Sequence, residues 1–170
     1  MSDKFYGKHR GKVLINIDPL QMGRLMVEVP SVAPFIPGSW AMPCLPIAGT
    51  QMGSYMIPPI NAGVWVEFEN GDPDKPIWTG CFWGSALEVP PLALAGNPAS
   101  PSIVLQTTGQ NTLVISDLPG PAGGIMLKSL TGAMILINDL GITITNGKGA
   151  IITMNAGPMV DINMGALSIT

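Results

Sequence analysis

Glycine recurs at an unbroken spacing of eight near the end of this chain, at Gly141, Gly149, Gly157 and Gly165. Apolar or β-branched residues follow each glycine, then comes a polar, asparagine-rich step, and Ala133 opens a further octad of the same kind. One short β-strand of about five residues and a bend would fill eight positions, and glycine permits the positive φ that a bend needs. The period therefore predicts a repetitive β-rod with these four glycines at its turns.

Such a rod is too open to be stable as a single chain. Its strand edges would be exposed along its length, and residues 102–170 contain only five charged side chains to cover an apolar surface. Three identical chains around a common axis would bury the apolar positions and pair the edges. We therefore predict a homotrimeric, intertwined triple-stranded β-helix whose axial core contains Ile135, Ile137, Ile144, Ile152, Val160 and Leu167.

The first half of the chain has a different composition. Residues 1–86 hold every aromatic residue and most of the charge. Short stretches such as Leu25–Val29 and Val64–Phe68 alternate apolar and polar residues, as strands with one buried face do, and Val13, Ile15 and Ile17 are expected to share one such face. About five strands in under 90 residues favour a five-stranded OB-fold barrel. The predicted fold class is all-β, with a barrel at 1–86, a linker rich in Pro, Ala and Gly at 87–101 and the β-helix at 102–170.

Composition also argues against several functions. The formal net charge of −3 does not suit a nucleic-acid partner. Cys44 and Cys81 show no metal or disulfide spacing, and no apolar run is long enough to span a membrane. Because no signal peptide precedes the first strand, we expect synthesis in the cytoplasm.

No catalytic or metal site emerges from the residue pattern. His9 is the only histidine and lies in a basic run near the N-terminus. Glu67 and Glu69 alternate with apolar residues, which places them on the outer face of a strand and not in a cleft. We therefore expect a protein that is not an enzyme, with no catalytic residue, no metal and no cofactor.

Residues 10–84 resemble the N-terminal OB-fold domain of the central spike proteins of contractile injection systems. These include the phage baseplate assembly protein V family, the VgrG proteins of type VI secretion and the spikes of extracellular injection systems. The octads at 133–170 are similar to the triple-stranded β-helix of the same spikes. The barrel part of the resemblance includes Gly23, Arg24, Trp65, Phe68, Gly71, Asp72, Pro73 and Gly80.

The resemblance implies a structural, membrane-piercing spike that connects a tube or hub to a tip protein. Because the hub-like domain of VgrG proteins is missing before the barrel, the hub or baseplate partner is expected to be a separate protein. The C-terminal residues have no histidine and end in an apolar strand. A separate PAAR-like protein is therefore expected to bind Leu167, Ser168, Ile169 and Thr170.

The expected setting is a phage tail or a secreted, extracellular contractile particle that touches its target membrane only transiently. Toxin cargo on the tip is left open by the sequence. The alternative is a β-helical adhesin or receptor-binding tail fibre. That function needs recognition sites near the distal end, and residues 102–170 contain no aromatic residue for them.

Overall fold

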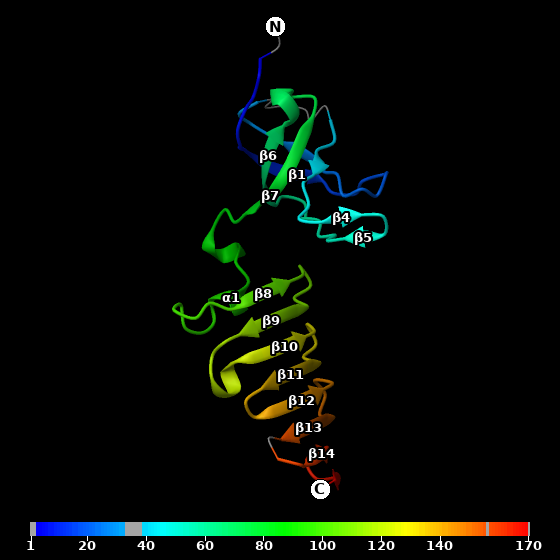
Figure 1. The fold of residues 1–170 in the computed structure, drawn as a ribbon, viewed down its shortest axis with the longest axis vertical. Helices are drawn as coiled ribbons and strands as arrows, with labels where there is room; N and C mark the ends of the chain where they lie inside the picture. The colour runs from blue at the N-terminus through cyan, green and yellow to red at the C-terminus, as the bar shows by residue number, and fades with distance from the viewer. Residues whose placement is uncertain (1–2, 33–38, 156, 170) are drawn as a thin grey trace. The chain divides into compact units, whose positions relative to one another are not determined.

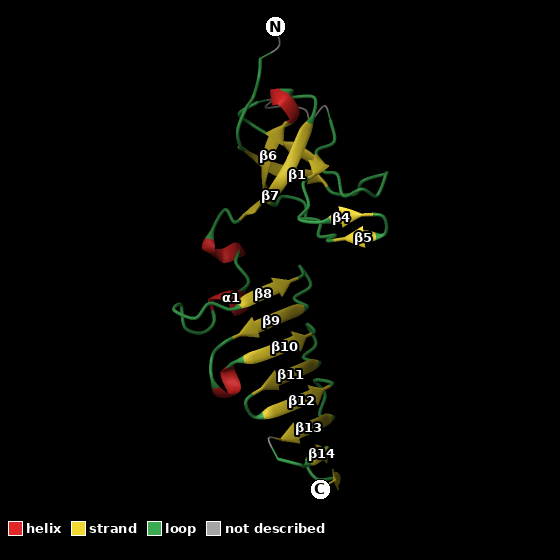
Figure 2. Ribbon diagram, in the orientation of Figure 1, coloured by secondary structure: helices red, strands yellow, loops and turns green. Residues whose placement is uncertain are grey.

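The computed structural model describes residues 3–32, 39–155 and 157–169. The chain divides into two compact units, Met1–Ala86 and Leu87–Thr170. Strands dominate both units, and the helices are single short turns (Figure 2).

The first unit is a small closed barrel. Its five-stranded sheet has the order β2-β1-β6-β7-β3, in which β3 and β7 are parallel and the other pairs antiparallel. Leu25 and Ala41 form a bridge with two backbone hydrogen bonds, which joins the two ends of the sheet. The strands are β1 (His9–Ile15), β2 (Met26–Glu28), β3 (Met42–Pro43), β6 (Gly63–Phe68) and β7 (Pro76–Phe82). The hairpin of β4 (Ala48–Gly49) and β5 (Met52–Gly53) and the 3₁₀ turn η1 (Glu69–Gly71) complete the unit.

The barrel core confirms most of the predicted alternation. Its buried hydrophobic side chains are Val13, Leu25, Val27, Val29, Ala41, Val64, Val66 and Trp78. The expectation that Ile15 and Ile17 share the buried face of Val13 is wrong, since both are exposed. The pairing of β1 with β2 shifts register between Val13 and Ile15, and β1 ends there. Beyond such an irregularity, alternation no longer keeps one face inward.

The second unit is an antiparallel sheet of eight strands in which each strand pairs with its neighbours in sequence (Figure 1). Residues 87–101, predicted to be a linker, belong to this unit and contain the helical turn α1 (Pro91–Leu94) after η2 (Ala86–Glu88). A further turn, η3 (Gly120–Ala122), separates β9 and β10. The strands are β8 (Ile103–Gln106), β9 (Thr112–Ser116), β10 (Gly124–Lys128), β11 (Met134–Asn138), β12 (Gly141–Thr145), β13 (Ile151–Asn155), β14 (Val160–Ile162) and β15 (Leu167–Ile169).

The glycine period and the strand spacing are related but not identical. Successive strands from β11 to β15 begin seven, ten, nine and seven residues apart, so eight is only close to their mean. Gly149, Gly157 and Gly165 lie in the connections between strands, whereas Gly141 is the first residue of β12. Gly141, Gly149 and Gly165 have positive φ.

Two strand-initial glycines are required by close backbone packing. Gly124 and Gly141 both have positive φ, at 94° and 125°. A Cβ on Gly124 would overlap the carbonyl oxygen of Ile137, and one on Gly141 would overlap that of Met154. Because the obstructing atoms are backbone, a side chain at either position would displace the next strand.

Candidate subunit interface

One face of the eight-stranded sheet carries only aliphatic side chains. Cross-strand partners in an antiparallel sheet point to the same side, and the pairings build two adjacent columns, one of seven side chains from β8 to β14 and one of eight from β8 to β15. We call this surface the aliphatic face. One column contains Ile103, Ile115, Ile125, Ile137, Ile142, Met154 and Val160; the other contains Leu105, Leu113, Leu127, Ile135, Ile144, Ile152, Ile162 and Leu167.

All six residues predicted for the axial core lie on the aliphatic face. Ile137 and Val160 belong to the first column, and Ile135, Ile144, Ile152 and Leu167 belong to the second. The octad pattern found six of the fifteen residues of this surface. Its continuation through β8, β9 and β10 lies outside the glycine frame and emerges only from the strand pairing.

Most of the aliphatic face is open to solvent in the single chain. Eleven of its side chains have exposed fractions between 37% and 61%. Among the described residues of the second unit, no hydrophobic side chain is buried. The unit therefore has no core of its own, and this face lacks a partner surface.

The total surface of the chain supports the same conclusion. Its accessible area is 11422 Å². A globular monomer of 17.8 kDa exposes about 8,000 Å², and two separate globules of half that mass expose about 9,600 Å². The excess shows that the chain is not folded as one or two self-contained globules.

A shallow, open groove follows the second column of the aliphatic face. It has a volume of about 580 Å³ and is lined by Leu105, Leu127, Ile135 and Ile144 together with polar residues of the strand ends, such as Asn111 and Thr145. Aliphatic side chains of another copy would fit such a groove, because packed interiors leave few voids larger than a water molecule.

The residues predicted to bind a tip protein lie at the last edge of the sheet. Leu167 and Ser168 pair with Ile162 and Asp161 of β14, and β15 is the final strand in the sheet order. Ile169 pairs with Val160, while Thr170 lies outside the described residues. Among the described residues, no strand pairs with the far edge of β15. Such an unpaired edge can accept a strand of another chain.

In the barrel, Arg24 of the predicted motif forms an ion pair that sequence reasoning missed. Its guanidinium contacts the Asp18 carboxylate at 2.7 Å, and the Asp18 side chain is only 2% exposed. Backbone N–H groups of Leu20, Met22 and Arg24 also donate to this carboxylate. The loop between the two residues closes because Gln21 and Gly23 adopt positive φ. Of these two residues, only the glycine indicates a turn in the sequence, because glycine favours positive φ.

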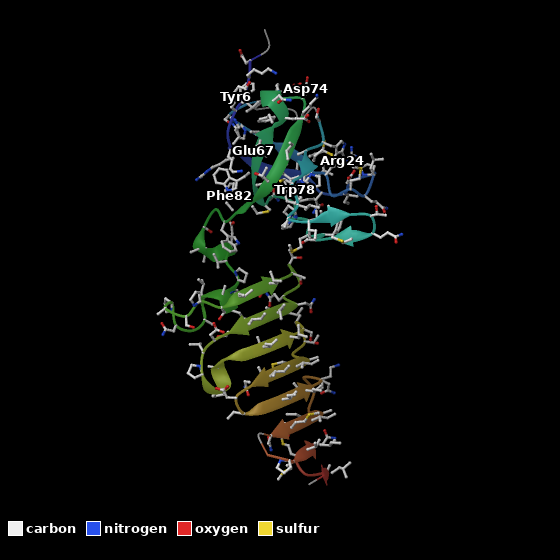
Figure 3. The ribbon with its side chains drawn as sticks, viewed as in Figure 1. Tyr6, Arg24, Glu67, Asp74, Trp78 and Phe82 are labelled. Atoms are coloured by element: carbon white, nitrogen blue, oxygen red, sulfur yellow. The ribbon has the colours of Figure 1, made fainter. Side chains whose placement is uncertain are left out.

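The same loop is anchored to the barrel core. The indole Nε1 of Trp78 donates a 3.0 Å hydrogen bond to the carbonyl oxygen of Gly23. The Arg24 guanidinium lies 5.3 Å from the centroid of the Trp40 ring, within cation–π range. Figure 3 labels Arg24 and Trp78 on the barrel. The Asp18–Arg24 pair therefore holds the entry of β2 against β7.

We expect Asp18→Asn to destabilise the barrel at neutral pH and much less in acid. The Arg24 guanidinium, helped by three backbone N–H groups, holds the pKa of Asp18 far below its usual value. A carboxyl group with a lowered folded-state pKa contributes stability that is fully present above its unfolded pKa of about 3.9 and is lost as pH falls toward the folded value. Thermal unfolding followed by tryptophan fluorescence reports on this unit, which holds all four tryptophans.

The matched control for this substitution is Asp74→Asn, because Asp74 is exposed. We expect the control to unfold at the wild-type temperature. The difference in unfolding temperature between Asp18→Asn and wild type should decrease steadily as the pH falls below about 4. A difference in unfolding temperature that does not change with pH would show that the carboxylate charge is not what stabilises the loop.

The other motif residues have structural positions. Gly71 adopts positive φ at the end of η1, and a Cβ there would lie 3.1 Å from the Tyr6 ring. Asp72 accepts a hydrogen bond from the backbone N–H of Asp74, so Asp72 and Pro73 form the turn before β7. Gly80 lies where the β6–β7 pairing shifts register. Trp65 packs against Phe82 with the rings tilted and 5.0 Å between their centroids, and Phe68 packs against the core.

The residues weighed for chemistry do not converge on a common site. The Nδ1 atom of His9 lies 2.9 Å from the Ser31 hydroxyl, and its ring contacts the rings of Phe5 and Phe68. Glu67 instead accepts a hydrogen bond from Lys8 on the barrel surface. Among residues 3–32, 39–155 and 157–169, no group of three His, Cys, Asp or Glu side chains could hold a metal ion. In the same part of the chain, no helix is long and apolar enough to cross a membrane.

Comparison with known families matches both units. Residues 9–83 match the type VI secretion system/phage-baseplate injector OB domain, and residues 102–168 match the phage baseplate V C-terminal trimerisation domain. No curated protein matches the chain.

An OB barrel followed by a trimerising β-domain defines a structural spike of the baseplate, built as an all-β homotrimer with a triple-stranded β-helix. The two matches lie in the family order and together cover 142 of the 170 residues. The chain belongs to the phage baseplate V family of spike proteins. Its setting is accordingly a phage tail or an injection particle.

Proposed function

We propose that three copies associate through the aliphatic face to form a stiff rod, which a contracting tail or injection system drives through a target membrane. The observation that carries this proposal is the extent of the face: two unbroken aliphatic columns cross seven and eight strands of a unit that has no buried hydrophobic residue of its own among those described. Burial of both columns around an axis would create the missing core. The match to a trimerisation domain fixes the number of copies that would share it.

The barrel would attach the rod to a separate hub or baseplate protein. The exposed side chains of this unit include Met22, Met52, Tyr55 and Met56, of which the last three lie within five residues of one another in the sequence. Flexible, polarisable methionines suit a surface that adapts to a partner, and clustered exposed apolar residues mark interaction sites. We infer that this surface faces the hub.

The membrane contact is proposed to be mechanical and transient, without chemistry. His9 and Glu67, the side chains considered for acid–base work, engage separate partners and do not approach a common cleft. The matched families are structural baseplate and injector domains, which supports the same inference. Particles assembled with a chain truncated at residue 101 test the mechanical function. We expect them to attach to target cells but to leave the envelope intact; envelope damage equal to wild type would contradict the proposal.

The end of the rod is proposed to bind a PAAR-like tip protein. Removal of residues 165–170 deletes β15, the strand whose far edge is open. We expect this truncation to abolish capture of a purified PAAR-like protein of the same system in a pull-down, while the solution mass remains that of a trimer. Removal of residues 1–4 is the control and should leave capture unchanged. A truncated chain that still captures the protein would place the tip site elsewhere.

A receptor-binding fibre is less well supported than a spike. Exposed aromatic side chains, which recognition sites favour, are found at Tyr6, Tyr55 and Trp83 of the first unit. Residues 102–170 contain no aromatic residue. Specific binding of the rod to surface glycans or proteins of a target cell would support a receptor-binding fibre over a spike.

A further inference from the structure

A second apolar surface lies on the opposite face of the sheet, but only on its first four strands. One column there runs in register through β8, β9, β10 and β11, and we call it the outer strip: Val104, Val114, Met126 and Leu136. In the next strands the same column continues as Thr143, Thr153 and Asp161. The outer face therefore changes from apolar to polar between β11 and β12.

The change matters because burial of the aliphatic face leaves the outer strip uncovered. Strands that are buried on both faces have nearly continuous apolar runs, whereas strands with one solvated face alternate. The segment Ile103–Leu105 in β8 and the segment Met134–Ile137 in β11 are uninterrupted apolar runs, while β12 alternates. The composition of the first four strands thus suits a sheet that is buried on both faces, whereas that of the later strands suits a sheet that is buried on one face only.

The dimensions of the outer strip favour a tethered occupant over a separate protein. Four strands about 4.8 Å apart give a strip roughly 15–20 Å long and one side chain wide. A stable interface between two freely diffusing proteins buries about 800 Å² on each partner, which one column of four side chains cannot supply. A segment already held in the same assembly needs far less contact, because its effective concentration is high.

Residues 87–101 have the composition of such an occupant. They contain a single charged residue, Glu88. Leu87 of η2 is 97% exposed and Leu94, the last residue of α1, is 65% exposed, so both leucines also lack cover. The nine residues from Leu94 to Ile103 can extend over about 30 Å, which exceeds the length of the strip.

We propose that, in the trimer, residues 87–101 of one copy lie across the outer strip of a neighbouring copy. The position of this segment in its own chain, where Gly96 lies beside Leu118, leaves both leucines exposed and the outer strip only half-buried. Three segments and three strips allow each copy to cover the next around the axis. This proposal rests on the trimer of the proposed function and adds a strap that joins its subunits.

Cysteine cross-linking in the full chain tests the strap. Leu94→Cys is combined with Met126→Cys after Cys44→Ser and Cys81→Ser have removed the natural thiols, and a short bismaleimide joins the two thiols without demanding disulfide geometry. We expect covalent dimers and trimers on a denaturing gel. The matched control pairs Leu94→Cys with Thr153→Cys, which lies in the same column on the polar half, and should remain monomeric on the gel.

The solution mass separates failure of the strap from failure of the trimer. Cross-links only within one chain, or none, in a protein with the mass of a trimer would overturn the strap alone. A monomeric mass would overturn the proposed trimer together with the strap.

A charge on the outer strip gives a second, independent measurement. Met126→Asp should leave the trimer assembled but release residues 87–101, with loss of their protection from a protease of broad specificity. Thr153→Asp places the same charge on the polar half and should keep wild-type protection. Equal cleavage of both variants would contradict the proposed contact.

Discussion

Ile144→Asp is expected to abolish the trimer and leave a monomer in solution. Ile144 lies in the middle of the aliphatic face, opposite Ile135 on one side and Ile152 on the other. Association would bury one carboxylate from each of three copies near a common axis, without a cationic partner. Each unpaired buried charge costs several kcal/mol, and three like charges repel one another in addition. Light scattering after size exclusion gives the mass directly.

The control for this experiment is the next residue in the same strand. Thr143 points to the opposite, polar side of β12, so Thr143→Asp introduces the same charge at almost the same height on the sheet. We expect the control to remain a trimer and to keep its resistance to dissociation in detergent. Loss of the trimer in both variants would show that the polar half of the outer face is also buried, contrary to the proposed interface.

Gly141→Ala is expected to produce the second large effect, a severe loss of rod stability. Positive φ costs a residue with a Cβ roughly 1–2 kcal/mol. The added methyl group would also overlap the Met154 carbonyl oxygen, so β13 would have to move away from β12. Since each of the three chains carries the substitution, the free energy of unfolding of the trimer should fall by about three times the cost per chain. Thermal unfolding of the rod, followed by far-UV circular dichroism, measures it.

Gly149→Ala separates the two contributions at Gly141. Gly149 also has a positive φ, of 106°, but nothing lies within 4 Å of the position that its Cβ would take. Its replacement should therefore lower stability only by the conformational cost of about 1–2 kcal/mol per chain. If the two alanine variants unfold at the same temperature, the backbone contact at Met154 does not govern the stability of the rod.

The sequence predicted the two-part, all-β organisation because both signals are local. Alternation in Val64–Phe68 and recurrence of glycine need no knowledge of distant contacts. The full aliphatic face was beyond such reasoning, since Ile103 and Ile115 join it only through strand pairing across a loop of irregular length. The Asp18–Arg24 pair was missed for a similar reason, because Gln21 gives no sign that it turns the loop.

The strand-initial glycines also bear on the size of the rod. Gly124 and Gly141 begin alternate strands, and the 17 residues from one to the other contribute two strands to the sheet. At about 4.8 Å per strand, each such module lengthens the sheet by roughly 10 Å. The other alternate strands begin 21 residues apart, from β8 to β10, and 19 residues apart, from β12 to β14. Gain or loss of one hairpin of about this size would therefore change the length of the rod in steps of two strands without reversing the direction of the chain.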